Sequence, residues 1–211
     1  MSDRAPQQRW EKVVEIVEVA VLALVAMATS FSGFQGTQWG GEQARLYGLA
    51  STTRFAADAA STLGGQELVA NSSIFTAWLQ AHAAGDRELE AELEKRFSPD
   101  YAAAFRAWLG TDPFTDPSAP AGPGYMPGFA NPSMTQAAAL NAQASAYFTD
   151  GTTARETANK YLRQTVLFAT VLFLVGISQR FRLRGVRIGA NALALLVLAF
   201  ALYGLAWLPR I

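Results

Sequence analysis

The chain has 211 residues, of which 51% are hydrophobic, with no cysteine and one histidine, His82. The lack of cysteine excludes disulfides, thiolate nucleophiles and thiolate metal sites, and a single histidine nearly removes the commonest metal ligand and general base. The 17 basic and 17 acidic residues balance, and no basic stripe with interleaved aromatics appears outside the ends of the apolar runs, so no nucleic-acid partner is predicted.

The first apolar run covers residues 13–35 and follows a short N-terminal segment, residues 1–12. About 20 mostly apolar residues match the hydrocarbon thickness of a bilayer, so the run predicts a transmembrane helix, although Glu15 and Glu18 lie in its first turns. A cleaved secretory signal is the alternative, because Ala26-Met27-Ala28 has the small-x-small pattern of a cleavage site. The glutamates argue against it, since a signal begins with a basic segment.

Residues 36–160 are more polar and predict a helical domain between the first and second spans. Residues 37–84 are rich in Ala, Ser, Thr and Gln and contain no proline, which favours a long helix that continues the first span. Residues 86–97 and 98–109 predict two short helices. Asp86 and Ser98 are the expected N-caps, because their side chains accept hydrogen bonds from the free N–H groups of a first turn.

Residues 110–132 are rich in proline and glycine and therefore predict an irregular segment. Residues 133–160 return to an Ala-rich helix, in which Asp150-Gly151 is a possible break. The simplest assembly is a helical hairpin or stalk, in which residues 37–84 run out from the membrane and residues 133–160 run back. Its expected core is aromatic: Phe55, Phe75, Trp78, Phe105, Trp108, Tyr147 and Phe148.

Two further apolar runs, residues 161–179 and 186–208, are joined by an arginine-rich loop, residues 180–187. Short loops rich in arginine stay in the cytoplasm, so the loop and the N-terminus are predicted to be cytoplasmic and residues 36–160 extracytoplasmic. The expected fold class is an all-α membrane protein with three transmembrane helices and an extramembrane helical hairpin or stalk.

Several segments have a distinctive combination of sequences: SGFQ at 32–35, WGGEQA at 39–44, FTAWL at 75–79, AFRAWL at 104–109, Met126-Pro127 and TVLFA at 165–169. Together they resemble a group of uncharacterised bacterial three-span inner-membrane proteins. The resemblance covers most of the chain and implies a three-span topology in a bacterial inner membrane. The group has no known activity, so the resemblance implies no catalytic or cofactor-binding residues.

One face of the first span carries residues spaced alternately by four and three, which places them in a single stripe. The stripe consists of Glu11, Glu15, Glu18, Leu22, Val25, Thr29, Ser32 and Gly36. If several copies surrounded an axis, the glutamates would attract cations, Leu22 and Val25 would form a hydrophobic gate, and Thr29 and Ser32 a polar vestibule. This pattern supports one hypothesis, a small homo-oligomeric ion channel.

The competing interpretation is that the intramembrane polar residues pair within one chain. Glu18 lies about 7 Å inside the cytoplasmic boundary at 1.5 Å per residue, and Asn191 lies about as deep on the third span. A bond from Glu15 or Glu18 to Arg184, Arg187 or Asn191 offsets the cost of a carboxylate in lipid without any transport role. We favour this interpretation over the channel.

The chain has no Gly-x-Ser-x-Gly elbow, no phosphate-binding glycine loop and no zinc-spaced histidines, so we predict neither an enzyme nor a cofactor site. Asp112 and Asp116 precede prolines, a turn signal that we favour over calcium binding. The predicted function is a structural or accessory subunit of a bacterial membrane assembly that uses its extracytoplasmic domain for protein–protein contact. Its predicted partners are the lipid bilayer and either further copies of itself or another membrane protein.

Overall fold

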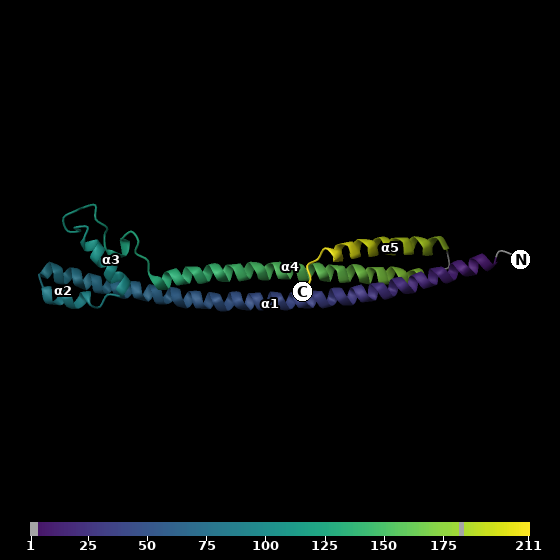
Figure 1. Ribbon diagram of the computed structural model, residues 1–211, viewed down its shortest axis with the longest axis horizontal. Helices are drawn as coiled ribbons and strands as arrows, with labels where there is room; N and C mark the ends of the chain where they lie inside the picture. The colour runs from purple at the N-terminus through teal and green to yellow at the C-terminus, as the bar shows by residue number, and fades with distance from the viewer. Residues whose placement is uncertain (1–3, 182–183) are drawn as a thin grey trace. The chain divides into compact units, whose positions relative to one another are not determined.

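The computed structural model describes residues 4–181 and 184–211, without the side chains of residues 4–15 and Arg184. All regular structure in these ranges is helical (Figure 1). The elements are α1 (Arg4–Ala84), α2 (Arg87–Glu94), α3 (Pro99–Leu109), the 3-10 helix η1 (Pro123–Tyr125), α4 (Pro132–Ser178) and α5 (Arg184–Ala206). As the sequence predicted, α1, α4 and α5 are long and apolar enough to cross a membrane. The chain divides into two units: unit 1 is Met1–Tyr47 with Phe148–Ile211, and unit 2 is Gly48–Tyr147.

In unit 1, α4 runs antiparallel to α1. Gly36 of α1 lies against Tyr161, while Tyr47, further along α1, shares a hydrogen bond of 3.3 Å with the hydroxyl of Thr152, which lies earlier in α4. Figure 1 shows α5 alongside the C-terminal part of α4. The three helices enclose a core of aliphatic, small and aromatic side chains: Val25, Ala28, Tyr161, Phe168, Val171, Val175, Ala194, Leu198, Ala201 and Leu205.

Helix α1 passes without interruption through residues 29–37, although this stretch carries several hydroxyl side chains. Three hydroxyl side chains there donate to carbonyl oxygens one turn earlier: Thr29 to Val25 at 2.7 Å, Ser30 to Ala26 at 3.0 Å and Thr37 to Gly33 at 3.0 Å. These bonds satisfy the hydroxyl donors on the helix itself. The polar residues therefore do not end the helix.

The predicted break at Asp150-Gly151 is also absent, since α4 is continuous from Pro132 to Ser178. Gly151 serves a different purpose, because the ring of Tyr47 packs directly over its Cα. A Cβ atom at this position would lie 2.6 Å from two carbons of that ring. The glycine therefore permits close approach of two helices and does not form a turn.

The core of unit 2 is aromatic and consists of Trp78, Phe97, Tyr101, Phe105 and Trp108. The two buried indole N–H groups have acceptors: Trp78 donates to Glu94 Oε1 at 3.0 Å and Trp108 to the carbonyl oxygen of Pro120 at 2.7 Å. Three of the seven aromatic residues predicted for the core are thus buried in it, and Phe75 packs against it.

The prediction was wrong for Phe55, which is 70% exposed, and for Phe148, which is 52% exposed, while Tyr147 is half-buried. The inward face of α1 beyond Tyr47 carries small side chains, including the buried Ala50 and Ala57, so Phe55 points away. Phe148 belongs to unit 1, where it stacks on Tyr47 with ring centroids 5.2 Å apart and leaves its other face exposed.

The helix ends of unit 2 follow local rules. Helix α1 ends before Gly85, whose φ of 72° lies in the left-handed region, and Asp86 N–H donates to the carbonyl oxygen of Ala81 at 3.0 Å. The carboxylate of Asp86 then accepts from Leu89 N–H at 3.0 Å and caps α2 as predicted. Ser98 precedes α3 as predicted, but its hydroxyl makes no capping bond and accepts from Asn71 Nδ2 at 3.0 Å.

Residues 110–131 are irregular apart from η1, in agreement with the sequence. Asp116 Oδ1 accepts hydrogen bonds from Ser118 N–H at 2.8 Å and from its hydroxyl at 2.7 Å, so this carboxylate stabilises a turn. At the start of α4, Glu67 Oε2 accepts from Asn131 Nδ2 at 2.8 Å and from Ser133 Oγ at 3.2 Å. These bonds join α1 to α4 within unit 2.

Candidate functional site

The structure brings Glu18 of α1 together with Arg187 and Asn191 of α5. Arg187 Nη2 donates to Glu18 Oε2 at 2.9 Å and to Oε1 at 3.0 Å, and its Nε donates to Oε1 at 3.2 Å. Asn191 Nδ2 donates to the same Oε1 atom at 2.8 Å. Both carboxylate oxygens are therefore engaged by donors from a helix 169 residues away in the sequence.

The helical repeat explains why the two donors act together. Arg187 and Asn191 are four residues apart on α5 and so share a face, which is turned toward α1. The Glu18 side chain is 7% exposed and that of Arg187 is 34% exposed, so the pair reaches from the helix interface to the surface. Charge-assisted hydrogen bonds of this kind offset the desolvation of the buried carboxylate.

The other two candidates, Glu15 and Arg184, lie outside the described side chains, although their backbones belong to α1 and α5. Of the four residues predicted to face a pore, Val25 and Ser32 are fully buried, and Leu22 and Thr29 are half-buried. Val25 belongs to the core of unit 1, and Leu22 packs against it. The described part of the stripe, from Glu18 to Ser32, therefore faces α4 and α5 of its own chain.

Three buried polar atoms have no hydrogen-bond partner among the described residues: Asn191 Oδ1, Ser32 Oγ and Gln164 Oε1. Gln164 of α4 packs against Gly204 of α5, where a Cβ atom would lie 2.5 Å from its amide nitrogen.

A second set of polar contacts holds the segment after α5, and sequence reasoning did not find it. The side-chain amide of Gln35 donates to the carbonyl oxygen of Ile211 at 3.0 Å and accepts from its N–H at 3.2 Å. Trp39 Nε1 and the Tyr161 hydroxyl both donate to the carbonyl oxygen of Pro209, at 3.1 and 2.9 Å. The four-residue spacing of Gln35 and Trp39 places them on one face, but nothing local identifies the backbone they hold.

In unit 2, His82 stacks between Trp78 and Phe114, with ring centroids 5.0 and 4.6 Å away. His82 Nδ1 lies 3.3 Å from Oε1 of Glu90, which is buried. Within the described part of the chain, no three His, Asp or Glu residues cluster closely enough to hold a metal ion. Nearby, burial raises the pKa of Tyr101 above its ordinary value.

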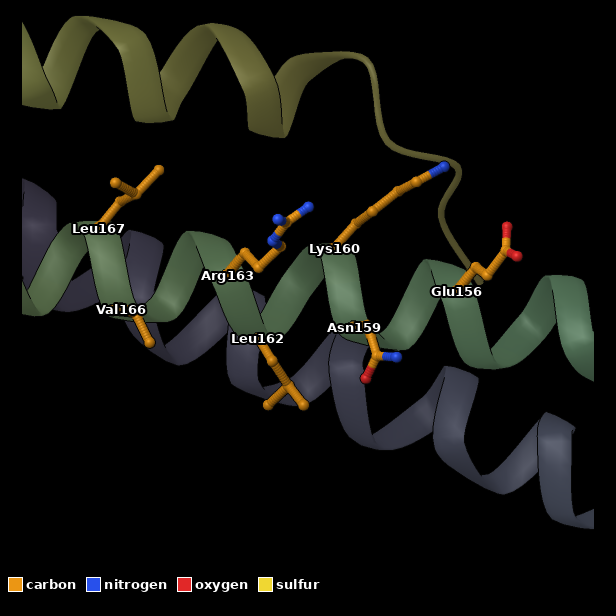
Figure 2. Close-up of a pocket in the computed structure, with 7 residues that line it drawn as sticks. All are labelled: Glu156, Asn159, Lys160, Leu162, Arg163, Val166 and Leu167. Carbon is orange, nitrogen blue, oxygen red and sulfur yellow. The ribbon is translucent and has the colours of Figure 1, made fainter.

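A groove of about 860 Å³ runs along the outer face of α4 in unit 1 (Figure 2). It is polar at one end and apolar at the other. Its lining residues are Glu156, Asn159, Lys160, Leu162, Arg163, Val166 and Leu167.

No protein-family model, curated protein or solved structure matches this chain.

Proposed function

We propose that the protein is a non-catalytic structural or accessory subunit of a bacterial membrane assembly. In this proposal the chain crosses the inner membrane at residues 13–35, 161–179 and 186–208. The N-terminus and the loop at 180–187 are cytoplasmic, and residues 36–160 form an extracytoplasmic helical hairpin that contacts other proteins.

The contact of Glu18 with Arg187 and Asn191 carries the proposal. A carboxylate at this depth of a span is costly in lipid unless it is paired, and here its partners come from the same chain. The pairing joins the first apolar helix to the third, which is a structural role. The burial of Val25 and Ser32 within the chain favours this structural role over a pore lined by the stripe.

The outer surface of unit 1 supports residence in a membrane. Large apolar side chains are exposed on all three helices, while Glu18, Ser32 and Gln35 are buried. This distribution suits a lipid environment, in which apolar side chains face outward and polar ones pair inside. The exposed residues include Ile16, Val19, Met27, Val166, Phe173, Leu196 and Phe200.

The exposed apolar side chains of unit 2 support its proposed role in protein–protein contact. Beyond its own aromatic core, it exposes Phe55, Val69 and Tyr125, the last of them 77% exposed. Aromatic residues are enriched at protein interfaces, because they bury a large area with little loss of conformational entropy. Either a second copy or another membrane protein fits this requirement.

Topology is tested directly because the chain has no cysteine of its own. Single variants Ala121→Cys and Gln179→Cys are treated in intact cells with a maleimide that does not cross the inner membrane. We expect Ala121→Cys to be labelled at once and Gln179→Cys only after the membrane is disrupted. The reverse pattern, or labelling of both in intact cells, contradicts the proposed orientation.

The native mass and symmetry of the detergent-extracted complex separate the two roles. We expect a defined complex with a second protein or copy, whose Glu18→Gln variant has lower thermal stability and unchanged ion flux in liposomes. A rotationally symmetric ring whose conductance depends on Glu18 supports the channel and contradicts the proposal.

A further inference from the structure

We propose that the groove along α4 binds the headgroup of an anionic phospholipid, with Lys160 and Arg163 holding its phosphate. The proposal rests on the membrane function above and assigns a ligand class to a surface of unit 1. Its first support is charge. Both side chains are exposed, they project to the same side of α4 (Figure 2), and neither has a hydrogen bond or ion pair among the described residues.

The second support is the change of polarity along the groove. Glu156, Asn159 and Lys160 lie at one end. Leu162 and Val166 are exposed toward the other end, where the apolar part of α4 begins, and they line the side opposite Lys160 and Arg163 (Figure 2). A phospholipid has the same order of groups, with a polar head followed by acyl chains. A free phosphate ion would use the cations but gain nothing from the leucine and valine side chains.

The third support is the position of the groove along α4, beside the C-terminal end of the apolar helix α5. Gly204 packs against Gln164, so the end of α5 lies beside this part of α4. The nearby Tyr203 and Trp207 are exposed, and such aromatics are typical of the membrane–water interface. The groove therefore lies where lipid headgroups are found.

The fourth support is that cations are disfavoured on this side of the membrane. The positive-inside bias depletes lysine and arginine near the outer ends of spans, yet two are adjacent here without a protein partner. An anionic headgroup supplies the missing countercharge, and each basic residue near such a surface strengthens binding. Two cations and the single carboxylate of Glu156 leave a net positive groove, which favours anionic over zwitterionic lipid.

The test uses the full chain, stripped of lipid in detergent and titrated with dioleoylphosphatidylglycerol or dioleoylphosphatidylcholine, with bound lipid counted by native mass spectrometry. We expect the wild type to prefer the anionic lipid and Lys160→Gln/Arg163→Gln to lose about fivefold in affinity for each charge removed. The matched control is Arg54→Gln/Arg155→Gln, which removes two exposed charges outside the groove and should keep the preference. An unchanged preference in the groove variant overturns the proposal.

Two further arms exclude misfolding and free phosphate. Glu156→Gln removes the repulsive carboxylate and should raise affinity for the anionic lipid up to about fivefold, a gain that misfolding cannot produce. Leu162→Ser/Val166→Ser should weaken lipid binding. If inorganic phosphate displaces the lipid equally well from wild type and this apolar variant, the groove is a phosphate site and the lipid assignment is wrong.

The outcome is separable from that of the proposed function. Topology labelling that contradicts three spans defeats both proposals. If labelling supports the spans while lipid preference is insensitive to Lys160 and Arg163, only the lipid site fails.

Discussion

The two units differ in the side chains that form their cores and in the polar contacts that accompany them. Unit 1 encloses aliphatic and small side chains, with a carboxylate–arginine–asparagine contact near one end and the held segment Pro209–Ile211 near the other. Unit 2 encloses five large aromatic side chains, of which the two tryptophans donate their indole N–H groups to nearby acceptors. The polar contacts in unit 1 join distant parts of the sequence, whereas the indole bonds of unit 2 span 16 and 12 residues.

The difference follows from the proposed surroundings of each unit. Lipid is as apolar as a protein core, so apolar burial hardly drives helices together in a membrane, and close packing and polar contacts select the arrangement. In water, aromatic burial is strongly favourable and compensates for Ala-rich helix faces that bury little area. The comparison implies that unit 2 is most sensitive to lost aromatic volume and unit 1 to lost polar partners or added volume.

The largest effect is expected for Trp78→Ala in unit 2. Trp78 is 2% exposed, and truncating a buried tryptophan costs about 3–5 kcal/mol. Hydrogen exchange should show faster opening of α2 and α3, with protection around Phe168 in unit 1 unchanged. Trp78→Phe keeps most of the apolar area and should lose much less. Equal deprotection of both units would mean that their cores are not separate.

Glu18→Ala should have the next largest effect, and in unit 1. It leaves Arg187 without its partner, which costs about 2–3 kcal/mol for a pair open to solvent on one side. Thermal unfolding of the purified chain in nanodiscs measures the loss. The charge reversal Glu18→Arg with Arg187→Glu should recover most of it. If the Glu18→Ala variant is as stable as the wild type, the contact does not hold α1 to α5.

The Gly151→Ala variant tests whether the absence of a side chain at Gly151 allows α1 and α4 to pack closely. The added methyl meets the ring of Tyr47, and overpacking of this kind costs about 1–3 kcal/mol. The matched control is Gly41→Ala in α1, where nothing lies within 4 Å, and there alanine should stabilise by about 0.5–1 kcal/mol. Thermal unfolding of the two variants side by side gives opposite signs. A change in stability of the same sign for both variants would contradict the close contact between Gly151 and Tyr47.

Asp86→Ala tests a local contribution in unit 2. It removes the capping bond to Leu89 N–H and should cost about 1 kcal/mol. Glu88→Ala in the same turn makes a control, since an exposed charge near a helix N-terminus contributes about 0.3 kcal/mol. Hydrogen exchange of α2 measures both. A larger loss for Glu88→Ala would mean that charge matters more than the cap.

The smallest effect concerns pH. Burial raises the pKa of Tyr101, so the folded state favours the neutral phenol. The associated stability is fully present below the unfolded value near 10 and is lost as pH rises through the folded value. Unit 2 should therefore lose stability above about pH 10, and Tyr101→Phe should reduce that loss. An unchanged alkaline profile in the variant would assign the effect to other groups.

Local patterns were good guides to the helices. The cap at Asp86, the irregular segment and the three long apolar helices follow from short-range chemistry, and the structure agrees on each, whereas the hydroxyl of Ser98 precedes α3 without a capping bond. The same reasoning failed at Asp150-Gly151, because the sequence does not distinguish a glycine that forms a turn from one that allows two helices to pack closely. It also failed at Phe55, since aromatic content alone does not say which way a helix face points.

By itself, then, the sequence determined the all-α class, the three apolar helices and a short set of polar residues that needed partners. Only the tertiary structure decided that Glu18 meets Arg187 and Asn191, and that Gln35, Trp39 and Tyr161 hold the segment after α5. The reason is that helical periodicity fixes which residues share a face. The rotation of one helix against another depends on packing between residues far apart in the chain.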